Sequence, residues 1–221
     1  MTGAKPIAAA ALAGVPAGVQ AQGVWAGRRQ LFVRFAGEAE TATMYTATAL
    51  VREIERQLSR SKFHSLSIGG RDPLANVPFL QAALEAAPRH VPVMLDTDGQ
   101  RPAAVLEIAD RLALVQVTVE FTGPEAGIMH AVETLKAAAQ AGRRHALVLS
   151  PREDTTDAQI LRIVEQAASA SAAVEVVIHP TMPTGEGLML DRRWSTLLEQ
   201  AMGTHADCTM TLRLPPPAGL R

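Results

Sequence analysis

With 221 residues, the chain is long enough to form one domain of ordinary size around a continuous core. A formal net charge of -1 gives no electrostatic reason to expect nucleic acid or an anionic membrane as a partner. The single cysteine, Cys208, excludes an internal disulfide framework, a cysteine-rich zinc site and an intrachain iron–sulfur cluster held by several thiolates.

The first 17 residues are rich in alanine. Lys5 and the apolar run 7–15 weakly imitate a signal peptide, but alanine is a poor substitute for leucine in that role. We therefore predict a weakly structured leader over residues 1–17 of a cytoplasmic protein, followed by a single domain over residues 18–221. No apolar run approaches the length of a membrane span, so no membrane association is expected.

Short apolar runs alternate with helical periodicities through the first half of this domain. The predicted strands are 31–35, 64–68 and 91–95, and the predicted helices are 45–60, 79–86 and one that begins at Pro102. Proline suits the first turn of a helix, where its missing N–H would have no partner. The residues of this third helix that are expected to face the core are Val105, Leu106, Ile108 and Leu112.

The second half repeats the same alternation. The predicted strands are 114–121, 145–149, 174–179 and 209–214, and the predicted helices are 127–141, 157–169 and 194–202. Repeated strand–helix units indicate a parallel sheet covered by helices. Roughly six or seven such units without internal linkers predict an α/β fold, a parallel-sheet partial (β/α)6-type barrel.

Acidic residues follow several of the predicted strands. Asp72 follows strand 64–68, Asp96 and Asp98 follow strand 91–95, and Glu120 lies at the end of strand 114–121. Ligands collect at the carboxyl ends of parallel strands, and a rim of carboxylates suits a divalent cation or an amine-bearing ligand. The alternative is that such residues only cap helices, as Asp157 would for helix 157–169.

The segment from residue 18 to residue 45 carries a recognisable pattern. Residues 18–27 read G-V-Q-A-Q-G-V-W-A-G, and residues 31–38 read L-F-V-R-F-A-G-E. This pattern resembles the opening of 7-carboxy-7-deazaguanine synthase, a family of radical S-adenosylmethionine (radical SAM) enzymes. The sequences of that family contain the motif S-I-Q-G-E-G, followed by F-V-R-L-x-G-C-x-x-x-C-x-x-C. With Gly37 on the family glycine, the three cluster-binding cysteines are replaced by Glu38, Ala42 and Tyr45.

The resemblance also implies where a ligand would bind. Gln20 and Arg34 stand as the family has them, Arg34 for a carboxylate of a pterin- or purine-like ligand, and Gln22 replaces a glutamate that would bind the heterocycle. A second motif, residues 69–74, looks like the family T-G-G-E-P-L and implies ligand positions at Gly69, Gly70 and Asp72, although Arg71 stands at the position of the acid. Asp96 belongs to a strand end similar to the family E/D-T-N-G.

Two hypotheses of different class follow. In the first, the protein is a cluster-less radical SAM-like pseudoenzyme that acts by binding a partner protein or a small pterin- or purine-like ligand. In the second, a non-radical enzyme uses rim carboxylates and Mg²⁺ on a heterocyclic substrate; the carboxylates would be Glu38, Asp72, Asp96, Asp98 and Glu120.

The same residues and the same resemblance also lead to expectations about metals, cofactors and oligomeric state. The six histidines show no close pairing, and Ala47 replaces the family threonine that helps to hold magnesium, so no resident metal is expected. No cofactor is expected either, because the cluster ligands are replaced; whether S-adenosylmethionine still binds stays open. The family's members are typically homodimers, and the resemblance therefore implies a homodimer.

Overall fold

The computed structural model describes residues 8–121, 126–181 and 192–212. Residues 1–7 of the predicted leader, and residues 213 and 214 of the last predicted strand, lie outside this range. The described elements follow in the order β1 (Ala9–Gly14), β2 (Ala17–Val19), β3 (Arg29–Phe35), β4 (Thr43–Thr46), α1 (Ala47–Leu58), β5 (Ser65–Gly70), η1 (Pro73–Asn76), α2 (Val77–Ala86), β6 (Val93–Thr97), α3 (Pro102–Leu106), η2 (Ala109–Arg111), β7 (Leu114–Glu120), α4 (Ala126–Gln140), β8 (Arg144–Ser150), α5 (Asp157–Ala170), β9 (Glu175–Ile178), α6 (Arg192–Thr204) and β10 (Cys208–Met210).

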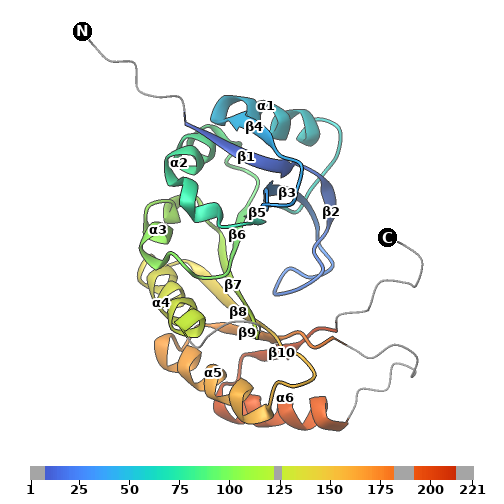
Figure 1. Ribbon diagram of the computed structural model, residues 1–221, viewed down its shortest axis with the longest axis vertical. Helices are drawn as coiled ribbons and strands as arrows, with labels where there is room; N and C mark the ends of the chain where they lie inside the picture. The colour runs from blue at the N-terminus through green and yellow to red at the C-terminus, as the bar shows by residue number, and fades with distance from the viewer. Residues whose placement is uncertain (1–7, 122–125, 182–191, 213–221) are drawn as a thin grey trace.

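The sheet is mostly parallel. Its order is β10-β9-β8-β7-β6-β5-β3-β1-β4, and β3 and β5 to β10 pair in parallel with a helix after each of the first six. Figure 1 shows the sheet curled into an arc with helices α1 to α6 along its outer side. The α/β fold with a parallel sheet is therefore confirmed, and among the described strands the sheet is open, since its edges β10 and β4 do not pair.

The N-terminal edge of the sheet is antiparallel, and the sequence did not predict it. β1 pairs antiparallel with β3 and with β4, and β2 pairs antiparallel with β3. The expectation of a weakly structured leader is thus wrong for residues 9–14. Leu12 is fully buried (0% exposed) and Ala10 is buried beside it, while Ala9, Ala11 and Ala13 are exposed. This alternation is that of a half-buried strand.

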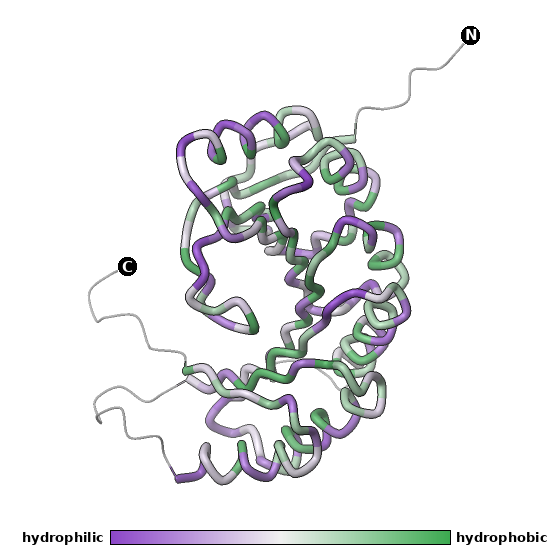
Figure 2. Tube along the Cα trace, turned by 180° about the vertical axis from the view of Figure 1, so that it is seen from behind, coloured by the Kyte–Doolittle hydropathy of each residue, from purple (hydrophilic) through white to green (hydrophobic). Residues whose placement is uncertain are grey.

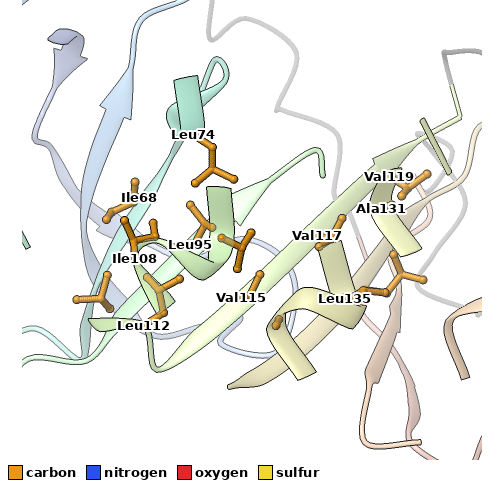
Figure 3. Packing of buried hydrophobic residues seen from close by; sticks show 14 of the residues in the cluster. Ile68, Leu74, Leu95, Ile108, Leu112, Val115, Val117, Val119, Ala131 and Leu135 are labelled. Carbon is orange, nitrogen blue, oxygen red and sulfur yellow. The ribbon is translucent and has the colours of Figure 1, made fainter. Parts of the chain in front are cut away.

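The main core lies between the sheet and the helices. Alternate strand residues point outward into it, among them Val115, Val117 and Val119 of β7, and Ala131 and Leu135 of α4 pack against them (Figure 3). Parallel strands that bury one face under helices are rich in such β-branched residues. One residue of the predicted inward set differs: Leu106 is 49% exposed, because α3 ends there and the chain continues as η2.

Local hydrogen bonds fix the helix starts. Thr156, not Asp157, caps α5: its side chain accepts from the Gln159 backbone N–H, and the Gln159 side chain accepts from the Thr156 backbone N–H in return. This reciprocal pattern satisfies donors that the first turn leaves without partners. The helix predicted from residue 45 begins at Ala47, because Thr46 caps it and Tyr45 belongs to β4.

Candidate functional site

A cavity of about 650 Å³ lies at the carboxyl ends of the parallel strands. Its lining includes Gln22 from the hairpin loop 20–28, Gly70 at the end of β5, Asp96 at the end of β6, and Thr118 and Glu120 at the end of β7. Gln100 and His130 also line the cavity, together with Asp154 and Thr155 of the β8–α5 connection and Gln159, Arg162 and Ile163 of α5. This volume is typical of sites that bind small molecules.

Asp96 is the most perturbed acid of this cavity. Its Oδ1 accepts a hydrogen bond of 2.9 Å from Thr118 Oγ1, across two neighbouring strands. Burial raises the pKa of the Asp96 carboxyl above its ordinary value, because a charge is costly away from water; the Thr118 hydroxyl and the nearby Gln116 amide oppose the rise. Perturbed acids of this kind are characteristic of binding and catalytic sites.

Gln116 is a residue that the sequence reasoning missed. It pairs in register with Asp96 and is completely buried (0% exposed). Its amide lies close enough to Asp96 to act on that carboxyl, yet among the described residues neither Nε2 nor Oε1 has a partner with the geometry of a full hydrogen bond. A glutamine inside the apolar strand sequence L-V-Q-V-T-V was the available signal, since amides are seldom placed in such a run.

The hairpin loop 20–28 enters the arc of the sheet and forms one wall of the cavity. The views from both sides show this loop on the inner side of the sheet (Figures 1 and 2). Trp25 anchors the loop, because it packs against Met94, Leu114 and Ala146 and meets the His64 ring edge-on at 4.9 Å between centroids.

Gly23 allows the loop to approach the sheet closely. A Cβ at this position would lie 1.8 Å from Gln116 Oε1, and its φ of 79° also favours glycine. The loop backbone closes on itself through Gln20, which donates to Arg28 O and accepts from Gly27 N at 2.9 and 2.8 Å. Gln20 is buried at the base of the loop, and Gln22, two residues on, reaches the cavity lining.

Two ion pairs involve the connections that follow β3 and β5. Glu40 accepts from Arg34 Nη2 at 2.8 Å and from the Gly37 backbone N–H at 2.9 Å. Arg71 Nη2 donates to Glu38 at 3.0 Å. These side chains are partly or largely exposed, so each pair contributes little to stability.

A third ion pair joins the loops after β5 and β6. Arg101 donates to both carboxylate oxygens of Asp72, with Nη2 to Oδ2 at 2.7 Å. The hydrogen bond from Arg101 lowers the pKa of the Asp72 carboxyl below its ordinary value. Asp72 also adopts a positive φ of 41°, which directs the chain into η1.

The three degenerate cluster positions do not form a ligand set. Glu38 and Ala42 lie exposed in the connection before β4, Glu38 pairs with Arg71, and Tyr45 packs partly buried against the main core. Iron–sulfur clusters are held by thiolates, and these residues supply one carboxylate, one methyl and one phenol. They do not fit a cluster. Within residues 8–121, 126–181 and 192–212, no group of three His, Cys, Asp or Glu side chains is arranged to hold a metal ion.

The structure thus brings only some of the predicted ligand positions together. Gln22, Gly70 and Asp96 line the same cavity, as do Asp98 and Glu120 of the magnesium hypothesis. Gly69 packs beside Asp96, and Gln20, Arg34 and Asp72 are not among the lining residues. The role of each predicted position in binding stays a prediction.

Comparisons with known proteins agree with the family resemblance predicted from the sequence and with the parallel α/β fold. Over 117 residues the chain is 31% identical to 7-carboxy-7-deazaguanine synthase from Methanothermobacter thermautotrophicus; the match covers 47% of this chain and 46% of the relative. The crystal structure of SuiB from Streptococcus suis bound to S-adenosylmethionine matches with a TM-score of 0.56 at 13% identity, covering 80% of this chain and 45% of SuiB. The chain is radical SAM-like. This relationship, predicted from the sequence, is confirmed.

A second SuiB structure gives the same result, with a TM-score of 0.55 at 14% identity over 80% of this chain and 44% of SuiB. At such identity the structural likeness shows the fold alone. The radical SAM-like chain spans about half the length of each of these proteins. No family model matches the sequence. Among the described helices, none has the length and apolar character needed to cross a membrane.

Proposed function

We propose that this radical SAM-like protein is a pseudoenzyme that binds a small pterin- or purine-like ligand in the cavity beneath the hairpin loop 20–28. The observation that carries the proposal is the pairing of a cavity of small-molecule size with a partly buried, hydrogen-bonded acid, Asp96, at its wall. Beyond its bond from Thr118 this carboxyl can accept further hydrogen bonds, and the amino groups of a pterin or purine supply suitable N–H donors.

The chemistry of the cluster positions supports binding over radical catalysis. Reductive cleavage of S-adenosylmethionine needs an electron, which in radical enzymes comes from a bound cluster. Here Glu38, Ala42 and Tyr45 replace the three thiolates. The radical route is therefore closed to this chain acting alone, whereas a binding cavity is independent of those positions.

The shape of the cavity favours a small molecule over a protein partner as its occupant, because protein partners bury broad surfaces instead of filling a concavity of this size. The magnesium hypothesis ranks behind the binding hypothesis. Two of its five carboxylates, Glu38 and Asp72, are already paired with Arg71 and Arg101, and the carboxyl of Asp96 has a raised pKa, which disfavours the charged form that a hard cation requires.

Calorimetric titration of the purified protein tests the proposal, with 6-carboxypterin, GTP, S-adenosylmethionine and Mg²⁺ as separate probes and mass spectrometry for conversion. We expect 6-carboxypterin or GTP to bind and to be recovered unchanged. Asp96→Asn should weaken that binding by about tenfold, since a hydrogen bond to a charged or strongly polarised group is worth about 1.5–3 kcal/mol.

Asp110→Asn is the matched control, because it makes the same chemical change at a fully exposed position. Equal weakening by both variants, or no binding of any probe, would overturn the proposal. Magnesium-dependent conversion would establish the enzymatic alternative instead. Iron and acid-labile sulfide that co-purify stoichiometrically with the protein would contradict both.

A further inference from the structure

Gln116 carries two buried polar atoms, Nε2 and Oε1, that have no hydrogen-bond partner within the part of the chain that the structure describes. Most buried side-chain polar atoms in proteins are hydrogen-bonded, and an amide left without partners costs free energy that an apolar side chain of the same shape would not. Val115 and Val117, its neighbours in β7, face the main core, so packing on the outer face does not require an amide here; on the inner face the amide acts on the Asp96 carboxyl. A residue that costs stability calls for a role outside stability.

The surroundings of Gln116 point toward the cavity. Its register partner on β6 is Asp96, and Thr118 follows two residues later on the same face of β7; both line the cavity. Gly23, whose missing Cβ leaves room for the amide, is next to Gln22, a third lining residue. Gln116 therefore lies directly behind three residues of the cavity wall.

The opposite side of Gln116 is closed. Leu114, two residues earlier on the same face of β7, belongs to the apolar cluster with Trp25, Met94 and Ala146. Ala146 is also the register partner of Gln116 on β8. Apolar side chains offer an amide no hydrogen bond, so the direction from which a partner can come is that of Asp96, Thr118 and the loop.

We infer that Gln116 is a specificity-determining residue of this site, and that its carboxamide pairs with the lactam edge of a heterocyclic ligand, an N–H beside a C=O. This inference rests on the proposed function and adds the residue that would recognise one edge of the ligand. A carboxamide presents an acceptor oxygen beside an NH₂ donor, which is complementary to a lactam. Since Gly23 covers the amide, pairing requires a change of the Gln116 side-chain rotamer toward Asp96 and Thr118, or a shift of the loop.

A structural role and a recognition role make opposite predictions for an apolar replacement. Gln116→Met keeps the length of the side chain and removes both polar atoms. If the amide serves recognition, the variant is at least as stable as the natural protein and binds a lactam ligand less well. If the amide serves the fold, the variant is less stable and loses affinity for every ligand alike.

The experiment measures the free energy of unfolding and the dissociation constants of two probes, 6-carboxypterin and pteridine-6-carboxylate. The second probe keeps the ring and the carboxylate but lacks both the lactam edge and the 2-amino group, so each variant is compared with the natural protein on the same probe. We expect Gln116→Met to unfold at the same or a higher temperature and to bind 6-carboxypterin about tenfold or more weakly, with unchanged affinity for pteridine-6-carboxylate. Gln140→Met, the same change at an exposed residue of α4, should alter neither quantity.

Each other outcome is decisive. Unchanged 6-carboxypterin affinity in Gln116→Met overturns the role of Gln116 and leaves the proposed function standing. Equal losses for both probes, or failure of both Gln116→Met and the smaller Gln116→Leu to fold, show that the amide is structural and also overturn the inference. If the natural protein binds neither probe nor GTP, the proposed function falls and the inference falls with it.

Discussion

The two faces of the sheet are built from the same strands but in different ways. On the outer face, alternate residues of β3 to β9 join the helices in one continuous apolar core. On the inner face, the apolar part is a small cluster around Trp25, and beside it lie polar side chains, among them Asp96, Gln116 and Thr118. Figure 3 shows the outer core, and Figure 2 shows the inner side with the hairpin loop in it.

This difference separates stability from binding within one sheet. Burial of apolar area on the outer face supplies most of the favourable free energy of folding. The inner face contains a partly buried acid with a raised pKa and an amide that has no hydrogen-bond partner among the described residues, both of which oppose folding. Unfavourable features of this kind are expected where a site is prepared for a ligand.

The largest effect should come from the outer core. Leu135 of α4 is fully buried against β7 and its neighbours. We expect Leu135→Ala to lower the free energy of unfolding by about 2–5 kcal/mol, the range for a buried leucine that leaves a cavity. Urea denaturation measures it, and Met129→Ala, at a residue of the same helix that is 70% exposed, is the control. Similar losses in the two variants would remove the distinction between core and surface on this helix.

Replacement of Trp25, which anchors the hairpin loop 20–28, should lower the free energy of unfolding by less and should affect mainly that loop. Trp25 is nearly buried (8% exposed), but it belongs to a loop with few partners. We expect Trp25→Ala to cost about 1–3 kcal/mol, below the range for a tryptophan of the main core, and to speed amide hydrogen exchange mainly over residues 20–28. Loss of protection throughout the strands would show that the inner cluster supports the whole fold.

The smallest expected effect is the pH dependence of the free energy of unfolding that Asp96 on the inner face causes. Because the pKa of Asp96 is raised in the folded protein, the folded state holds this proton more tightly than the unfolded chain does. Its contribution to stability is therefore present at acid pH and is lost as pH rises from the unfolded pKa, about 3.9, through the raised folded pKa. Asp96→Asn removes this loss.

The measurement is the free energy of unfolding of the natural protein and of Asp96→Asn across that pH range. The advantage of the variant should grow as pH rises. Acids with lowered pKa values, such as Asp72 and Glu53, give the opposite slope at acid pH, but they are common to both proteins and cancel in the difference. A difference that does not change with pH would contradict the perturbation of Asp96.

Sequence patterns predicted the repeating strands and helices because apolar and polar residues alternate clearly in them. They failed for β1, where exposed Ala9, Ala11 and Ala13 are the same residue type as buried Ala10 and give no contrast with it. β4 was also missed, and its Tyr45 was assigned to the following helix because no breaker residue separates the two elements. A strand can be predicted from sequence when adjacent residues differ clearly in hydropathy; the mean hydropathy of the segment matters less.

Part of the cavity lining was expected from the sequence, because the alternation of apolar and polar residues locates the ends of the strands. Strand ends are easy to locate in a parallel fold, so Asp96, Asp98 and Glu120 were expected on one rim, and the resemblance added Gly70 and Gln22. All five line the cavity, and their roles in binding stay predictions. The ion pairs were not foreseen, because Glu40 and Arg101 come from connections whose path the sequence pattern does not encode. Gln116 was overlooked because a single polar residue within an apolar run carries no motif.

The position of β1 has a practical consequence for anyone who produces the protein. In the described sheet β4 pairs with β1 alone, so an expression product that starts at Gly18 would leave β4 and the α1 that follows it without their neighbour. It would also empty the place that Leu12 fills. Affinity tags and trimming therefore belong upstream of residue 8, and a truncation guided by motif boundaries would remove an integral strand.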